Sequence, residues 1–310
     1  MRKRAVLSVV LLLAATAVSA RPVGPADSPL DLGEQDDGVP RRERYTGLSV
    51  MAGAGAYWAD DVTANFYSGK PENANTISRV LYSNTYGQRI WENLTTAGLI
   101  SSAVGSYNEL KVVEYPEMYY RTSYQVGVGI RYDYRSGFGW LMRFDLGRLQ
   151  AIGAFNLSST NGTGILTDNH QYIRCGVLGK EDRINIDFAL TRTVELGGNL
   201  CLELDLGASL NNTKVKENLI EVNGATYSIL DVWGGRSPDY GVGSYEYVNQ
   251  GGIGWGVFMS GLVGYHIDGV GALKAGYTCH HSKTTLEGYT AMGWQHCITI
   301  RIEINNFSFL

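Results

Sequence analysis

The chain has 310 residues, of which 44% are hydrophobic and 18% charged, and its formal net charge is −4. A mildly acidic chain without a long basic run argues against a nucleic-acid partner. Its four cysteines, Cys175, Cys201, Cys279 and Cys297, show no C-x-x-C spacing, so no disulfide scaffold is expected.

The first residues, MRKRAVLSVVLLLAATAVSA, have the three parts of an export signal. A basic start is followed by an apolar stretch, 5–17, and by small residues at 18–20. The apolar stretch is too short to cross a bilayer as a helix, so residues 1–20 are predicted to be a signal peptide. Residues 21–44 are rich in proline and acidic residues and are predicted to form a disordered periplasmic lead-in.

From Tyr45 onward, apolar residues recur at every second position, most clearly in 124–134, 200–210 and 298–304. A soluble sandwich or jelly roll also alternates, but its apolar faces pack inward. Here the apolar faces are long and end in aromatics, while the polar faces carry glycine and charges of both signs. A tilted membrane strand needs ~9–11 residues, whereas globular strands are usually nearer 5–6. The pattern therefore favours a membrane barrel.

Eight strands are predicted, and the connections between them alternate in length. Long connections follow the first, third, fifth and seventh strands, and tight turns follow the second, fourth and sixth. A membrane barrel has long loops at one mouth and short turns at the other, with both termini on the short-turn side. The predicted fold class is an all-β, eight-stranded antiparallel up-and-down transmembrane β-barrel with long extracellular loops, over residues 45–310. The strands are 46–58, 120–134, 138–155, 184–194, 199–212, 252–267, 270–282 and 294–304, with long connections at 59–119, 156–183, 213–251 and 283–293.

In such a barrel, lipid takes the place of a core, and the sheet closes so that every backbone group is paired. An eight-stranded barrel is just wide enough to be filled by its own side chains. The charged residues of inward parity are expected to form a compensating network of salt bridges, with conduction or proton transfer as the alternative. They are Arg131, Asp133, Arg143, Asp145, Asp187, Glu203, Asp205, Lys274, Arg301 and Glu303.

This pattern resembles the eight-stranded outer-membrane β-barrel proteins of Gram-negative bacteria, the OmpA-transmembrane-domain and OmpX-like group. It also looks, more loosely, like the uncharacterised barrel proteins of Bacteroidetes. The resemblance covers about residues 46–310 and implies surrounding outer-membrane lipid and lipopolysaccharide. It also implies the barrel-insertion machinery as a partner, reading C-terminal aromatics that Phe307 and Phe309 supply here. Leu310 stands where the group usually ends in Phe. The group has many roles, so it fixes location better than function.

The long connections contain the candidate binding residues. In the first, Ile77, Val80, Leu81, Ile90, Trp91 and Leu94 recur at helical spacing and predict one or two short helices over the outer mouth. In the third, Asn223-Gly224 predicts a type I′ hairpin. Aromatic residues of the third connection are candidates for contact with a partner or surface ligand, with packing inside the loop as the alternative. They are Tyr227, Trp233, Tyr240, Tyr245 and Tyr247.

No residue set predicts a catalytic or metal centre, and no cofactor is expected. Cys279, His281 and His296 could share one face, but it is the outward one, a poor place for Zn²⁺. A rim enzyme acting on peptide or lipid would need acidic and histidine side chains at the outer rim, and the available ones do not have the sequence spacing of a known catalytic motif. They are Asp60, Asp61, Asp168, His170, His280 and His281. The preferred hypothesis is a non-enzymatic barrel whose loops bind a partner, a surface ligand or another membrane subunit. A rim enzyme (protease or acyltransferase) and a narrow small-solute pore are the alternatives.

Overall fold

The computed structural model describes residues 45–100, 106–159, 172–230 and 250–305. The chain divides into two units, Met1–Val39 and Pro40–Leu310, and everything described below belongs to the second. The predicted signal peptide and lead-in, 1–44, lie outside the described residues.

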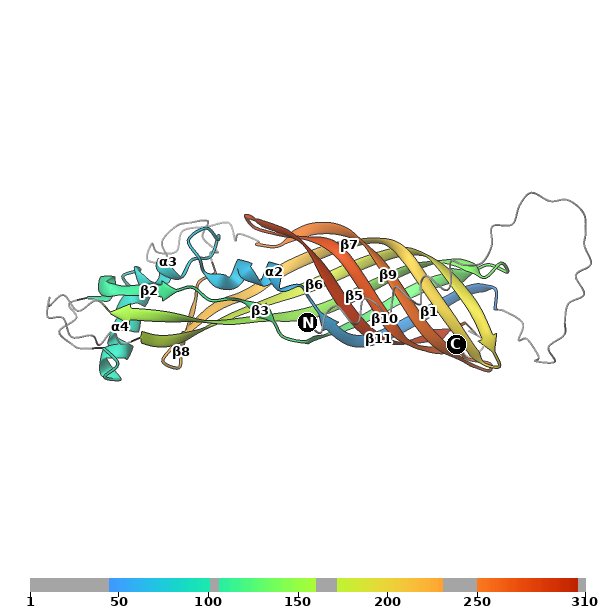
Figure 1. Cartoon of the computed structure of the whole chain (residues 1–310), viewed down its shortest axis with the longest axis horizontal. Coiled ribbons are helices and arrows are strands. Elements are labelled where there is room, and N and C mark those ends of the chain that lie inside the picture. Colours follow the sequence, from blue (N-terminus) through green and yellow to red (C-terminus); the bar gives the residue numbers. More distant parts are fainter. Residues whose placement is uncertain (1–44, 101–105, 160–171, 231–249, 306–310) are drawn as a thin grey trace, which may run out of the picture. The chain divides into compact units, whose positions relative to one another are not determined.

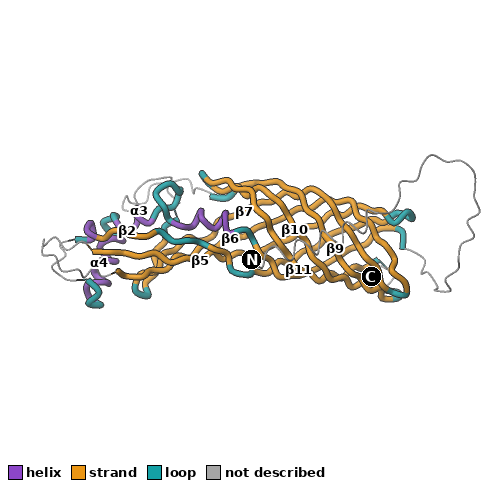
Figure 2. The backbone as a smooth tube through the Cα atoms, in the orientation of Figure 1, coloured by secondary structure: helices purple, strands orange, loops and turns teal. Residues whose placement is uncertain are grey.

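Eight long antiparallel strands form a closed ring (Figures 1 and 2). Their order is β5–β4–β1–β11–β10–β9–β7–β6, and β6 pairs back with β5 to close it. Closure leaves no unpaired strand edge around the ring, which a sheet in hydrocarbon requires. The predicted eight-stranded antiparallel up-and-down barrel is confirmed. The ring strands are β1 (Gly47–Trp58), β4 (Ser123–Asp133), β5 (Phe138–Ser159), β6 (Tyr172–Gly197), β7 (Leu200–Val222), β9 (Gly252–Ile267), β10 (Gly271–Leu286) and β11 (Tyr289–Ile304).

Short turns join neighbouring strands at one end of the barrel, here called the turn end. They lie between β4 and β5, β6 and β7, and β9 and β10, where β1 also begins and β11 ends. The opposite, loop end carries the long connections. One of these was predicted wrongly. Residues 283–293 are not a loop, because β10 and β11 stay paired as far as Leu286 and Tyr289 and turn tightly through Glu287 and Gly288.

The outside of the barrel carries a continuous apolar belt. On β7 it runs over 200–210, the ~9–11 residues that a tilted strand needs to cross hydrocarbon. Aromatic residues border the belt, with Tyr134 and Phe138 at the turn end and Tyr124 and Trp255 toward the loop end. Such a surface is stable only against lipid, so the ring is a transmembrane barrel. No described helix is long and apolar enough to span a membrane.

On three neighbouring strands, the apolar side changes partway along. Along β5, Phe144 and Leu146 are exposed on the outside, whereas Leu149 and Phe155 are buried on the inside. The long strands β6 and β7 show the same reversal. β6 has Ile184 and Phe188 outside but Ile173 and Val177 inside. β7 has Leu206 and Leu210 outside but Ile220 and Val222 inside.

The reversal falls at one level of the sheet. Arg148 of β5 pairs with Asp182 of β6, which pairs with Lys214 of β7, and all three stand on the outside just past the last belt residues. Apolar side chains turn outward where the outside is hydrocarbon and inward where the outside is water. This level therefore marks the edge of the hydrocarbon layer.

Beyond that level, β5, β6 and β7 continue as an open sheet, the head sheet. It gains β2 (Leu110–Glu114) and β3 (Tyr119–Tyr120) beside β5 and β8 (Ala225–Ser228) beside β7. The predicted strands 184–194 and 199–212 are therefore too short. The predicted Asn-Gly hairpin is confirmed, since Asn223 and Gly224 take φ of 47° and 77° and join β7 to β8.

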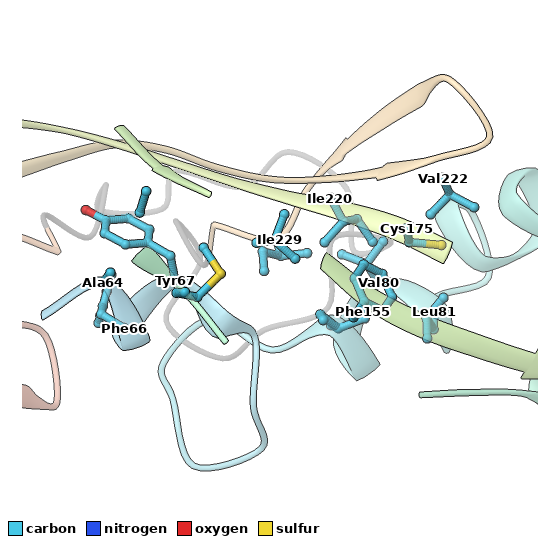
Figure 3. Packing of buried hydrophobic residues seen from close by; sticks show 14 of the residues in the cluster. Ala64, Phe66, Tyr67, Val80, Leu81, Phe155, Cys175, Ile220, Val222 and Ile229 are labelled. Atoms are coloured by element: carbon cyan, nitrogen blue, oxygen red, sulfur yellow. The ribbon is translucent and has the colours of Figure 1, made fainter. Parts of the chain in front are cut away.

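Helices cover the inner face of the head sheet. The predicted helices exist as α3 (Ile77–Leu81) and α4 (Tyr86–Thr96), and their apolar residues are buried against Phe155, Cys175 and Ile220 (Figure 3). They pack on the head sheet rather than over the mouth, because the extended strands offer an apolar face there. The mouth is instead contacted by α2 (Asp61–Ala64) and η1 (Asn65–Ser68); η2 (Tyr107–Glu109) precedes β2.

Candidate functional site

All ten charged residues expected in the lumen are buried there, because each has the inward parity of its strand. Near the turn end, Arg131 donates to Asp133 at 2.6 Å and to Glu203. Lys274 approaches Glu203 at 2.5 Å and also pairs with Glu303. Two cations from β4 and β10 thus bridge three carboxylates from three strands.

Arg301 links this group to the middle of the lumen. Its guanidinium lies 3.8 Å from Glu203 and 3.4 Å from Asp205. Asp205 also accepts a 2.7 Å hydrogen bond from Ser260. The network therefore continues around the barrel wall through β11, β7 and β9.

The middle of the lumen is organised around Arg143, which lies 2.5 Å from both Asp145 and Asp187. His280 adds a contact of 3.1 Å from its Nε2 to Asp187. The assignment of His280 to the rim is thus wrong, because this residue has the same strand parity as Lys274 and points into the lumen. Reading its parity along β10 would have found it.

Buried side chains point into the lumen from every ring strand that the structure describes. Between the charged groups, Met51, Leu141, Ala189 and Phe258 form a small apolar layer. A cavity of about 10 Å³ beside Arg143 is large enough for about one water molecule. This packing fits a structural plug.

A second buried polar cluster closes the loop end of the lumen. This mouth cluster consists of Tyr57, Tyr67, Tyr120, Glu181 and Arg183. Glu181 accepts hydrogen bonds from Tyr67 at 2.6 Å and Tyr120 at 3.1 Å, and it pairs with Arg183 at 2.5 Å. Arg183 also donates to the Tyr57 hydroxyl at 3.4 Å. Burial, reinforced by the Glu181 charge, raises the pKa of Tyr67 and of Tyr120 well above the ordinary tyrosine value.

This cluster was not predicted, because Glu181 and Arg183 lie within the predicted loop 156–183. Their parity with Asp187 would have identified them, had the strand been extended. Tyr67 reaches the cluster from η1 and lies against Gly179, where an added Cβ would collide with the Tyr67 ring. The glycine therefore makes the space in which the tyrosine is seated.

Two of the proposed rim acids hold α2 in place. Asp60 caps the helix, accepting from the Val62 amide at 3.0 Å, and also accepts from the Trp294 amide at 3.1 Å. Asp61 accepts from the Tyr120 amide at 2.9 Å. These contacts anchor the α2–η1 segment to β11 and β3, which is a structural role.

The remaining candidates for a rim enzyme do not converge in the part of the chain that the structure describes. His281 lies on the outside with its ring centroid 4.4 Å from that of Trp294, while His280 is in the lumen. Asp168 and His170 lie outside the described residues. Cys279 does stand opposite His296 in the β10–β11 register. No group of three or more His, Cys, Asp or Glu among the described residues could hold a metal ion.

Of the aromatic binding candidates in the third connection, Tyr227 can be placed. It lies on β8, partly buried, with its ring centroid 6.3 Å from that of Tyr86 in an edge-on arrangement. This contact ties β8 to α4. The other four candidates and the C-terminal aromatics lie outside the described residues: Trp233, Tyr240, Tyr245, Tyr247, Phe307 and Phe309.

No protein-family model matches the chain, and no curated protein matches it. Among solved structures, the chain is similar to Neisserial surface protein A, with 10% identity and a TM-score of 0.39, over 84% of this chain and 97% of that one. It is also similar to Ail, the attachment invasion locus protein of Yersinia pestis, with 8% identity and a TM-score of 0.29, over 83% and 100%. Ail in complex with the heparin analogue sucrose octasulfate gives 8% identity and a TM-score of 0.31 over the same shares.

Proposed function

We propose that this protein is a non-enzymatic outer-membrane barrel that displays its head sheet outside the cell, where the head binds a partner or surface ligand. One observation carries the proposal. The apolar side of three adjacent strands reverses at the level of Arg148, Asp182 and Lys214. The same strands thus cross the hydrocarbon and then build a water-exposed domain with a core of its own.

The lengths of the strands support the display of the head outside the cell. β5, β6 and β7 are 22, 26 and 23 residues long, well beyond the ~9–11 that the membrane requires. The additional length, together with α3, α4 and the short strands, forms a packed head. A barrel that served only as an anchor would not need this extension, so the head is the part offered for recognition.

The orientation follows from the connections. The short turns, the start of β1 and the end of β11 lie at the turn end, which we assign to the periplasm. The head then lies outside the cell. Residues 1–20 serve as the signal peptide and 21–44 as the periplasmic lead-in. The barrel-insertion machinery delivers the chain into outer-membrane lipid and lipopolysaccharide. Its strand number and turn pattern suit the OmpA-transmembrane-domain and OmpX-like group.

Thiol labelling of intact cells tests this topology, since the four native cysteines are all buried. Tyr82→Cys places a thiol at an exposed head position, and Arg135→Cys is the matched variant at a turn. A membrane-impermeant maleimide should label the Tyr82→Cys variant on intact cells, and the Arg135→Cys variant only after permeabilisation. The reverse pattern would contradict the proposal.

Membrane fractionation tests the barrel itself. The protein should remain in outer-membrane fractions and migrate anomalously on a gel until boiled. A chain found in the periplasm would refute membrane insertion.

Planar-bilayer recordings should show no steady conductance, because buried charged and apolar side chains occupy the described lumen.

The binding role is tested with the aromatic candidates of the third connection. Replacing Tyr227 and Trp233 by Ala should weaken capture of a partner or surface ligand while the barrel stays heat-modifiable. Met292→Ala, on the outward belt, is the matched control and should leave capture unchanged. Equal capture by all variants would remove these residues from the binding surface.

A further inference from the structure

The head sheet has a second face, opposite the helices. On β6, the buried residues Ile173, Cys175 and Val177 face the helices, so Arg174 and Gly176 face outward. Ala154 of β5 and Glu221 of β7 pair with Gly176 on that same outer face. The head sheet thus presents three adjacent strands to the exterior.

A groove of about 300 Å³ lies on this outer face. Two small residues of its lining, Ala154 and Gly176, form the floor, and Arg174, Glu221 and Asn223 form the walls; Cys175 and Gly224 complete the lining. The volume is at the lower end of the range for small-molecule sites.

The fold does not require glycine at 176. A Cβ there would meet Glu221 at 3.5 Å, an ordinary contact, and the residue does not have a left-handed φ. Gly179, on the same strand, is different because a Cβ would collide with Tyr67. Because residue 176 has no side chain, the floor of the groove is open to a ligand.

The walls offer both hydrogen-bond donors and acceptors. The Arg174 guanidinium donates, the Glu221 carboxylate accepts, and both are exposed. Asn156 pairs with Arg174 across the strands and is oriented by donating to Glu114 at 3.0 Å. A wall with both donors and acceptors suits a ligand rich in hydroxyl groups, because each hydroxyl group can both donate and accept a hydrogen bond.

Charge around the groove is balanced. Arg174 and Glu221 both line the groove, and Lys111 and Glu114 also carry opposite charges on the neighbouring strand β2. A polyanion or polycation would gain little net attraction from such a surface. The charge balance therefore selects a neutral ligand.

Tyrosines flank the groove on the same face. Tyr119 of β3 pairs with Ile152 and is 51% exposed, and Tyr172, two residues before Arg174, is 58% exposed. The span from Leu178, opposite Ile152, to Tyr172 is six residues, or ~20 Å at ~3.3 Å per residue. Flat amphipathic rings at both ends suit the apolar faces of sugar rings.

From these features we infer that the outer face of the head sheet binds a neutral oligosaccharide along β6. Ala154 and Gly176 form the floor, Arg174 and Glu221 hydrogen-bond hydroxyls, and Tyr119 and Tyr172 stack on terminal rings. The inference rests on the proposed display of the head outside the cell and names the class of ligand that the head would meet there.

The test uses the full-length protein in detergent micelles, screened against an array of neutral and sulfated oligosaccharides. Binding to at least one neutral oligosaccharide is expected, with affinity changing less than about twofold between about 0.05 and 0.3 M NaCl. Gly176→Val and Arg174→Ala should each lower that affinity by about tenfold or more, as expected when a groove is filled or a hydrogen-bonding group is lost. Lys214→Ala, on the outer surface at the membrane edge, should leave it unchanged.

Each variant is first confirmed to be heat-modifiable, which separates loss of binding from loss of folding. Absence of binding to every neutral oligosaccharide, binding restricted to sulfated ones, or unchanged affinity in Gly176→Val would each overturn the inference. Thiol labelling of the Tyr82→Cys variant reports the display of the head independently, so failure of the ligand assignment and failure of the proposed function can be told apart.

Discussion

The barrel and the head share three strands yet are built in opposite senses. In the barrel, Arg143 and Asp187 are buried while Phe144 and Phe188 face outward. In the head, Phe155 of the same β5 strand is buried in an apolar core. Along β5 the period of two continues across the boundary, so the surrounding medium decides which side of the strand is apolar.

The two regions are consequently stabilised by different interactions. The barrel interior depends on compensation among buried charges, which tolerates no unpaired member. The head depends on apolar packing, in which the cost of a change scales with the cavity left behind. Substitutions should therefore damage the two regions in distinguishable ways.

The largest effect is expected from removing Arg131. This cation contacts Asp133 and Glu203, and Glu303 lies 3.8 Å away. Arg131→Ala removes the cation paired with the buried Asp133 and leaves Glu203 and Glu303 with fewer cations, so it should lower the free energy of unfolding by about 3–5 kcal/mol. Urea unfolding in lipid vesicles, followed by the heat-modifiability gel, measures the loss.

Arg192→Ala is the matched control for Arg131→Ala. Arg192 is an outward-facing cation whose guanidinium lies 4.9 Å from the Phe138 ring centroid. Its removal should cost about 1 kcal/mol or less. Equal losses in the two variants would show that the lumen network does not stabilise the barrel.

A slightly smaller and local effect is expected in the head. Leu94 of α4 is fully buried in the head core, and Leu94→Ala should cost about 2–5 kcal/mol. Because the barrel has a separate stabilising network, the head should become protease-sensitive while the barrel fragment stays heat-modifiable. Val113→Ala, at an exposed position of β2, should show neither change. Simultaneous loss of both regions would mean that they unfold as one unit.

The mouth cluster joins the two regions and can be tested through Gly179. Gly179→Val would force the Tyr67 ring from its seat beside Glu181 and should cost about 1–3 kcal/mol, as overpacking does. Proteolysis should then cut the α2–η1 segment. Gly147→Ala is the control, because an added Cβ there meets Tyr57 at 3.6 Å, an ordinary contact. Resistance of Gly179→Val to protease would show that Tyr67 does not hold this segment.

The difference between the barrel and the head also explains which parts of the fold could be predicted from the sequence. The eight ring strands followed from period-two alternation against lipid, and the lumen charges followed from the opposite parity. The outer halves of β6 and β7 were not predicted, because the strands were expected to keep their apolar residues on the outside throughout. In β6 and β7 the apolar residues change to the inside near Asp182 and Lys214. A bulge at Lys216 further shifts the parity of β7.

Contacts between residues far apart in the sequence could not be predicted for a different reason. Tyr67 meets Glu181 across 114 positions of the chain, and no local pattern around Tyr67 indicates that it reaches the lumen. The outer groove needs the pairing of Ala154, Gly176 and Glu221, which only the register supplies. Alternation predicts which side a residue faces, but not which residues become neighbours.

The smallest effect is expected at alkaline pH, where the stability that the mouth cluster contributes should change and that of the apolar head core should not. Burial and the Glu181 charge raise the pKa of Tyr67, so its phenol stays protonated in the folded protein above pH 10, while the unfolded chain ionises. The unfolded state then binds fewer protons, and stability falls as pH rises through about 10. Between pH 9 and 11, Tyr67→Phe should lose about 1 kcal/mol less than the parent protein, measured by urea unfolding at each pH. Tyr82→Phe, at an exposed position outside the mouth cluster, should follow the parent curve, and identical curves for all three proteins would show that Tyr67 is not held beside the Glu181 carboxylate.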